Sequence, residues 1–236
     1  MKKQIIYTLA TAALFSTVFL STTVKADDTA SDSTTSTAKI TFNGDNTDPV
    51  TPLNPDDPDT PVDPNTPIDP DDPNNGGTGD KGPLSIDYVS NITFGTKDIS
   101  TTGQIFHAVN ATPHVQITDK RGEEGGWVLT AAASKFTASD NSELKGAVLS
   151  FKNGVATTTS DNVSSKPTTN DVTFDNTDAK TMMTADSLAG QGTWLDTFKG
   201  TEGDNANVQL SVPSGSAQAK EYTATITWTL TAGPTK

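Results

Sequence analysis

The sequence lacks cysteine and has few hydrophobic and aromatic residues, and these absences limit what the protein can do. None of its 236 residues is cysteine, 32% are hydrophobic and only 6% are aromatic. Without cysteine the chain has neither disulfides nor thiol chemistry, and the low apolar content predicts that part of it builds no core. Small secreted domains usually carry disulfides, so if the chain is exported, its lack of cysteine is typical of a Gram-positive bacterium.

Positive charge is also scarce. The formal net charge is −13, and the longest basic cluster is Lys120-Arg121, followed two residues later by a pair of glutamates. A nucleic-acid-binding protein needs a basic surface to release counterions, so nucleic acid is excluded as a partner. Binding to an anionic membrane surface is disfavoured for the same reason.

The first 26 residues have the features of a secretory signal peptide. Lys2 and Lys3 precede an apolar stretch from Ile5 to Leu20, and Val24-Lys25-Ala26 fits the small-x-small cleavage site. The apolar stretch is short for a membrane-spanning helix. We therefore expect residues 1–26 to be removed, which leaves a secreted chain without a membrane anchor.

Residues 27–83 are predicted to be a disordered, acidic, Pro/Asp-rich spacer. Proline recurs at short intervals after Asp45, usually beside aspartate. Proline disfavours helix and like charges repel, so an extended, polyproline-like chain is favoured. The aspartates lack the closing glutamate of an EF-hand loop, which indicates a solvated spacer rather than a calcium site. Within the spacer, "AKITFNG" (residues 38–44) is a β-like island: an isolated strand, a short recognition segment, or simply part of the tail.

From Leu84 the composition becomes that of a β domain. Short alternating segments separated by turn residues predict an all-β sandwich or barrel. The segments are LSIDYVSNITFG, HVQITD, GWVLTAAASKFT, LKGAVLSFKNG, TWLDTF, VQLSV and YTATITWTLTA. "TDAKTMMTADSLAG" is left open as a long loop or a helical turn. We expect one all-β, β-sandwich-like domain over residues 84–236.

Two of the three tryptophans begin a Trp-x-Leu triplet. Residues two apart in a strand share a face, so Trp127 lies with Leu129, and Trp228 with Leu230. A large aromatic in an alternating strand most often fills the core, whereas an exposed pair would stack on the sugar rings of a polysaccharide. We expect Trp228 in the core, while the glycine-rich flank of Trp127 suggests an edge or rim.

The loop before the first triplet, "TDKRGEEGGW", combines both charge signs with glycines that permit unusual backbone conformations. It is either a plain hairpin or the rim of a binding site. Its candidate residues are Asp119, Lys120, Arg121, Gly122 and Gly126.

The sequence resembles the WxL-domain cell-surface proteins of low-GC Gram-positive bacteria. The resemblance rests on the two triplets, on the Asp-x-Arg-Gly and Gly-Trp flank of the first, and on the C-terminal "YTATITWTLTAGP" that contains the second. The order of signal peptide, spacer and domain is also similar. The resemblance implies non-covalent attachment to the cell wall through peptidoglycan or another wall polymer. It also implies partners among other WxL or anchored surface proteins, with Trp127, Leu129, Trp228 and Leu230 as motif positions.

The C-terminus favours the same mode of attachment. The chain ends six residues after Leu230 without a covalent sorting motif. We therefore expect a protein that remains at the surface by binding.

We expect no catalysis, no cofactor and no metal. A serine or threonine nucleophile would need His107 or His114 as its base, and neither lies in a motif. Two histidines are few for a zinc site, and the adjacent Glu123 and Glu124 do not form the separated pair that glycoside cleavage requires. The sequence favours a wall-binding module. The alternatives are a protein that binds other surface proteins, with indirect wall association, and an adhesin for host matrix.

Overall fold

The computed structural model describes residues 33–62, 66–123 and 125–233. The chain divides into two units, residues Met1–Ile40 and a compact unit Thr41–Lys236. The predicted signal peptide, residues 1–26, lies outside the described residues. In the described part, no helix is long and apolar enough to cross a membrane.

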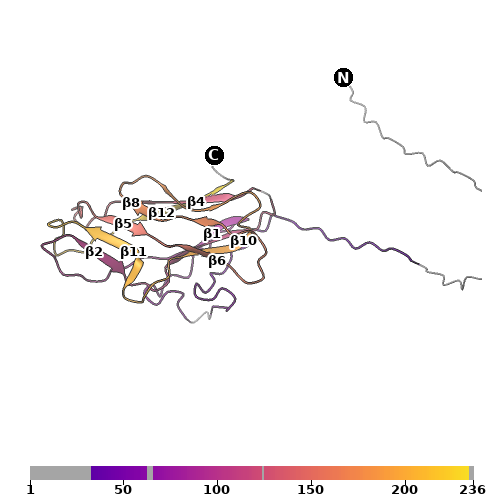
Figure 1. Cartoon of the computed structure of the whole chain (residues 1–236), viewed down its shortest axis with the longest axis horizontal. Coiled ribbons are helices and arrows are strands. Elements are labelled where there is room, and N and C mark those ends of the chain that lie inside the picture. The colour runs from indigo at the N-terminus through magenta and orange to yellow at the C-terminus, as the bar shows by residue number, and fades with distance from the viewer. Residues whose placement is uncertain (1–32, 63–65, 124, 234–236) are drawn as a thin grey trace, which may run out of the picture. The chain divides into compact units, whose positions relative to one another are not determined.

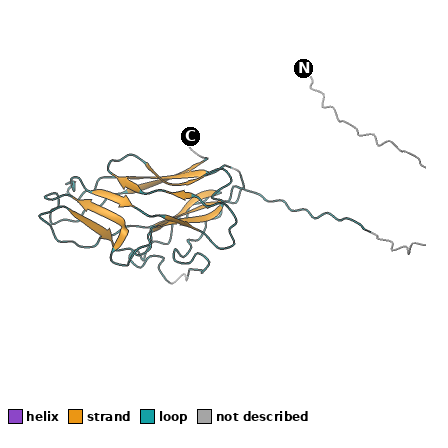
Figure 2. Cartoon of the chain, viewed as in Figure 1, coloured by secondary structure: helices purple, strands orange, loops and turns teal. Residues whose placement is uncertain are grey.

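The compact unit is built from strands and loops, and the described residues contain no helix (Figures 1 and 2). This confirms the all-β prediction. The strands are β1 (Leu84–Val89), β2 (Gln104–Ala108), β3 (His114–Asp119), β4 (Trp127–Ala133), β5 (Val148–Phe151), β6 (Val155–Thr157), β7 (Thr168–Thr169), β8 (Val172–Phe174), β9 (Lys180–Ala185), β10 (Gly192–Thr197), β11 (Asn205–Val212) and β12 (Ile226–Ala232).

The strands form three four-stranded antiparallel sheets. Sheet A has the order β1-β3-β10-β6, sheet B the order β2-β11-β5-β8, and sheet C the order β12-β4-β9-β7. β1 and β12 are therefore edge strands of sheets A and C. Many neighbours in a sheet come from distant parts of the sequence, so the fold depends on long-range pairing.

One apolar core joins all three sheets. Its fully or nearly fully buried side chains include Ile117 and Trp194 of sheet A, Phe151 and Val208 of sheet B, and Trp127, Leu129 and Met183 of sheet C. The ring of Phe151 packs edge-on against Phe198, with centroids 5.0 Å apart. Inward-facing residues of separate sheets share this core, as expected for a sandwich.

All seven segments expected to be strands contain one. The other five strands, β2, β6, β7, β8 and β9, were not foreseen, and the sequence of β9 suggested a loop or a helical turn. Met182 and Met183 are consecutive and both fully buried, so the strand lacks the simple alternation of a strand with one buried face. A β-bulge accounts for this. Leu129 pairs with Met183 and Thr130 with Thr181, so Met182 is an extra residue that interrupts the alternation of inward and outward side chains.

Sheet A is buried on both of its faces. Val115 and Ile117 of β3 belong to the apolar core, whereas His114, Gln116 and Thr118 alternate with them and face the opposite side. Those three polar side chains are almost inaccessible to solvent. The outer face of the sheet is therefore polar and covered.

The Pro/Asp-rich segment contributes to that cover. The backbone N–H of Leu53 donates to Gln116 Oε1 at 2.7 Å, and Gln116 Nε2 donates to the Thr51 carbonyl at 3.3 Å. Pro52 and Pro55 are buried. The amide of Gln116 thus binds the extended segment through both its donor and its acceptor.

This contact differs from the free spacer suggested by the sequence. The described part of the segment contains no helix or strand, but Asn110 Nδ2 donates to Asp69 Oδ2 at 2.7 Å, so it is tied down again farther along. Proline occupies every third position from Pro49 to Pro73. In the described part of the segment, the N–H groups of Thr60 and Asp72 donate to the carbonyls of Asp57 and Asp69 and close turns.

Candidate functional site

The two Trp-x-Leu triplets lie on adjacent antiparallel strands of sheet C. β4 and β12 pair along their whole length without a register shift, and the two leucines are opposite each other. The facing pairs are Trp127–Ala232, Leu129–Leu230 and Ala131–Trp228.

This register explains why the same sequence occurs twice. Both strands carry the pentapeptide Trp-x-Leu-Thr-Ala, at residues 127–131 and 228–232. Paired antiparallel about the central leucines, the pentapeptide is complementary to itself, because each tryptophan faces an alanine. A large residue opposite a small one fills the space between strand and core without overlap.

The first triplet is part of the core. Trp127 and Leu129 have no exposed surface. Trp127 Nε1 donates to the Gly190 carbonyl at 3.0 Å, which satisfies the buried indole N–H. A Cβ at Gly190 would come within 2.7 Å of that nitrogen, and the backbone there has φ of +71°, so the position requires glycine. The suggestion of an edge or rim for Trp127 is wrong.

The second triplet lies at the edge of the sheet. Trp228 and Leu230 are half-buried and pack against the core. The Trp228 ring meets Phe151 edge-on, with centroids 6.4 Å apart. The two tryptophans therefore differ in exposure because β4 is an inner strand and β12 an outer one.

The other face of β12 carries exposed threonines. Thr227, Thr229 and Thr231 are exposed, while Thr130 of β4 and Thr184 of β9 on the same sheet are half-exposed. Each hydroxyl both donates and accepts hydrogen bonds. Sheet C thus presents a hydroxyl-bearing face that is uncharged at these positions.

The candidate loop is fixed by an arginine clamp. Arg121 binds the buried Asp119 carboxylate through Nε at 3.0 Å and a terminal nitrogen at 2.7 Å. The same terminal nitrogen donates to the carbonyls of Gly125 and Gly126 at 2.9 and 3.1 Å. Hydrogen bonding to Asp119 raises the pKa of Arg121, so the clamp stays charged. The clamp ties the end of β3 to the start of β4.

The remaining loop positions are mostly held as well. A Cβ at Gly126 would lie 1.9 Å from the Ala185 carbonyl oxygen, so only glycine fits against β9. Lys120 Nζ donates to the carbonyl of Asp48 in the Pro/Asp-rich segment. Gly122 has φ of +65° and an open surrounding. Asp119, Arg121 and Gly126 thus make structural contacts, and Gly122 is exposed.

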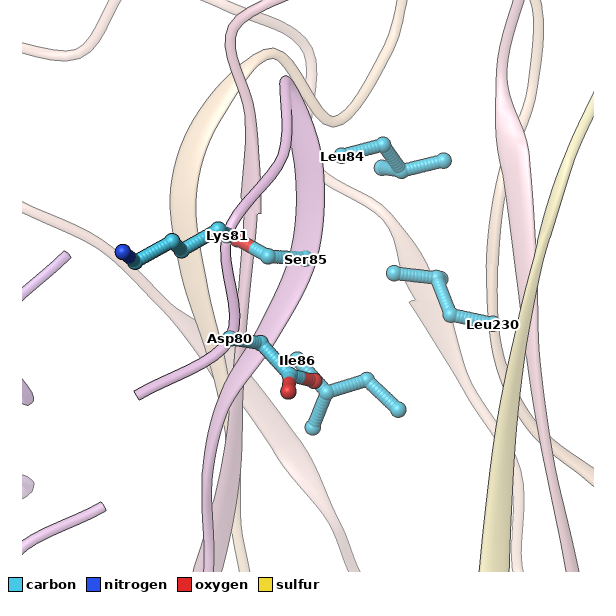
Figure 3. A pocket seen from close by; sticks show the side chains of 6 residues that line it. All are labelled: Asp80, Lys81, Leu84, Ser85, Ile86 and Leu230. Atoms are coloured by element: carbon cyan, nitrogen blue, oxygen red, sulfur yellow. The ribbon is translucent and has the colours of Figure 1, made fainter. Parts of the chain in front are cut away.

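A cavity of about 400 Å³ opens between the edges of sheets A and C. Leu84 and Ile86 of β1 point toward Leu230 of β12, whereas Lys81 points away (Figure 3). Asp80 and Ser85 complete the lining. Of the nine predicted site residues, only Leu230 lines this cavity, and sequence analysis missed its β1 side because the pairing of sheet edges is a tertiary property.

The two histidines have separate surroundings. His107 Nδ1 lies 2.6 Å from Asp204 Oδ1 near the surface. His114 is buried and stacks on Tyr88, with centroids 4.5 Å apart, and burial lowers its pKa to about 4. In the part of the chain that the structure describes, no group of three His, Cys, Asp or Glu side chains forms a metal cluster.

A family model described as "WxL domain surface cell wall-binding" matches residues 29–234. No curated protein and no solved structure matches the chain. The matched range includes the Pro/Asp-rich segment as well as the strands, in agreement with the contacts between them.

Proposed function

The chain belongs to the WxL-domain family of surface cell wall-binding proteins. From this premise we propose that its folded unit binds peptidoglycan directly, and that this binding holds the chain on a Gram-positive cell wall without a covalent link. Association with the cell wall at the cell surface follows from the family itself. The family match over nearly the whole chain is the observation that carries the proposal.

Because the first triplet is buried, the surface that contacts the wall polymer must lie elsewhere on the domain. Trp127 and Leu129 have no exposed surface, which supports a role in building the domain. The threonine face of sheet C, with Thr227, Thr229 and Thr231 exposed along β12, is the surface that we assign to the wall polymer. Alternate residues along a strand stand about 7 Å apart, which gives a regular row of hydroxyls for a polymer rich in hydroxyl and amide groups.

Charge favours peptidoglycan over anionic wall polymers. The chain has a formal net charge of −13, and removal of a signal peptide that contains three lysines and no acid would make it more acidic. Polyphosphate-type polymers carry like charge and would be repelled. A neutral glycan face bound by threonine hydroxyls avoids this repulsion.

The test is co-sedimentation of the mature chain, residues 27–236, with purified peptidoglycan freed of protein and anionic polymer. We expect the chain to pellet, and the Thr229→Val/Thr231→Val variant to pellet less because valine keeps the shape but loses the hydroxyl. The matched control is Thr96→Val/Thr101→Val, which changes two exposed loop threonines outside sheet C.

Two results would count against the proposal. If the wild-type chain stays in the supernatant while a known wall-binding protein pellets, wall association is indirect and passes through another surface protein. If the sheet C and control variants pellet equally well, the threonine face is not the contact surface.

A further inference from the structure

β12 is an edge strand with an open side. It pairs with β4 on one side and with no strand on the other within the described residues. Its sequence, ITWTLTA, contains no charge and no proline, the residues that usually protect an edge from further pairing. The other nearby edge, β1, is partly covered, because Thr78 donates through its N–H to the Asp87 carbonyl and through its hydroxyl to the Ile86 carbonyl.

The register shows which groups of β12 are free. Gly233 N–H donates to the Gly126 carbonyl, and Ser134 N–H donates to the Thr225 carbonyl. Because hydrogen bonding alternates along an antiparallel pair, the odd-numbered residues of β12 bond to β4. The N–H and C=O groups of Trp228 and Leu230 therefore point to the open side.

The space beside this open edge is lined by three apolar side chains, Leu84, Ile86 and Leu230, and by the polar Asp80, Lys81 and Ser85. The cavity of about 400 Å³ lies between β12 and β1, and Leu84, Ile86 and Leu230 converge on it (Figure 3). Leu230 and Trp228 are only half-buried. An added strand with apolar residues on one side would satisfy the open backbone groups and cover these side chains at once.

The chain contains such a strand. In residues 38–43, Ile40 is 75% exposed and Phe42 is 84% exposed, and they alternate with Lys39, Thr41 and Asn43. This alternation is typical of a half-buried strand. In the described structure the segment pairs with no strand, which leaves two large apolar side chains in solvent.

The direction of the chain argues for a partner molecule. Gly44 lies against the Arg121 backbone, since a Cβ there would be 2.1 Å from the Arg121 carbonyl oxygen. Arg121 also binds Gly126, which faces Gly233 at the end of β12. If residues 38–43 lay beside β12 of the same chain and led to Gly44, they would run parallel to β12. The strand pairs of the three sheets are antiparallel, and residues 38–43 can pair antiparallel with β12 of a second copy.

We propose that residues 38–43 of one chain add as an antiparallel strand to the open edge of β12 in a second copy, with Ile40 and Phe42 entering the cavity beside Leu230. The donor segment and the acceptor edge are different surfaces of the chain. Such a contact propagates head to tail, giving chains or rings of subunits. The threonine side chains on the exposed face of sheet C remain free, so wall binding and self-association use separate surfaces.

The first experiment measures the mass of the mature chain, residues 27–236, by sedimentation velocity over a range of concentrations. We expect association that grows with concentration and is weakened at least about tenfold by Ile40→Asp/Phe42→Asp. The control, Ile99→Asp/Val163→Asp, makes the same change at two exposed apolar residues outside the donor segment and should associate like the wild type. A wild-type chain that stays monomeric throughout would overturn the proposal.

The second experiment locates the acceptor. A labelled peptide of residues 36–44 should bind the Ile40→Asp/Phe42→Asp chain, and a peptide with the same two substitutions should not. Hydrogen exchange at the amides of Trp228 and Leu230 should slow when the wild-type peptide binds. Binding that leaves these two amides unchanged would place the peptide elsewhere and refute the assignment to β12, and neither result depends on whether the chain sediments with peptidoglycan.

Discussion

Leu129 and Leu230 face each other across the β4–β12 pair, at the centre of two copies of the same pentapeptide. Around this centre, Trp127 faces Ala232 and Trp228 faces Ala131. The repeated motif is therefore a packing device. Each copy supplies the large side chain and the small one that the other copy needs, and the pairing buries the first tryptophan completely.

The pairing predicts that the alanine opposite Trp228 cannot be enlarged. Ala131 is fully buried, so Ala131→Leu should force the neighbouring side chains apart and destabilise the fold by about 1 to 3 kcal/mol. Ala132→Leu, one residue along and half-exposed on the other face, is the matched control and should change stability little. Denaturant unfolding measures both, and equal losses would contradict the proposed complementarity.

Trp127 should matter more to stability than Trp228. Trp127→Ala removes a fully buried indole that is bonded to the Gly190 carbonyl, and should cost about 3 to 5 kcal/mol. Trp228→Ala removes a half-buried ring at a sheet edge and should cost less. Unfolding curves for the two variants, compared with Trp194→Phe as a mild core change, give the order. A larger loss at Trp228 would show that the edge strand is more buried than this structure has it.

Gln116 should control the docking of the Pro/Asp-rich segment. Gln116→Leu removes the acceptor for the Leu53 N–H and the donor to the Thr51 carbonyl and to Asp87 Oδ2. We expect faster hydrogen exchange at the Leu53 amide and earlier proteolysis within residues 45–62, with a stability loss of about 1 to 3 kcal/mol for the polar groups left unpaired.

The control for this experiment is Gln209→Leu, because Gln209 bonds to Lys152 and Ala206 away from the segment. Unchanged exchange at Leu53 in the Gln116 variant would mean that the segment is held by its other contacts.

Asp196 should make the fold less stable as pH rises. Its carboxylate is fully buried and accepts no hydrogen bond from the described residues. Burial, and then the charge of Asp171, raise its pKa to about 8. The folded state thus keeps a proton that the unfolded chain, with its ordinary pKa of 3.8, has lost. This contribution to stability is complete below pH 4 and is lost as pH rises toward 8.

Asp196→Asn is neutral in both states and should remove this loss. The difference in Tm between the variant and the wild type should therefore shift in favour of the variant as pH rises from 4 to 8. In a chain of this size, each kcal/mol of unfolding free energy corresponds to about 2 to 4 °C in Tm. Asp98→Asn makes the same chemical change in an exposed loop and should show no such trend. A constant difference in Tm across this range would mean that Asp196 is ionised in the fold.

Local pattern was enough to predict the all-β class and seven strand segments, because alternation and turn residues act within a few positions. It missed the strands β2, β6, β7, β8 and β9; at β9 the bulge opposite Leu129 places Met182 and Met183 both inside. Local pattern also failed to predict that Trp127 is more deeply buried than Trp228. The glycine-rich flank of Trp127 suggested an edge or rim, yet Gly126 is glycine because the Ala185 carbonyl lies against it.

The sequence by itself determined the acidic charge, the all-β class and the WxL family, since charge, alternation and the repeated triplet are properties of the chain. Only the tertiary structure decided where the triplets point and what the Pro/Asp-rich segment does. Strand order makes β4 an inner strand and β12 an edge, which buries Trp127 and leaves Leu230 at an open cavity. The polar face that binds residues 51–53 exists only once β1, β3 and β10 have paired, because distant strands supply its groups.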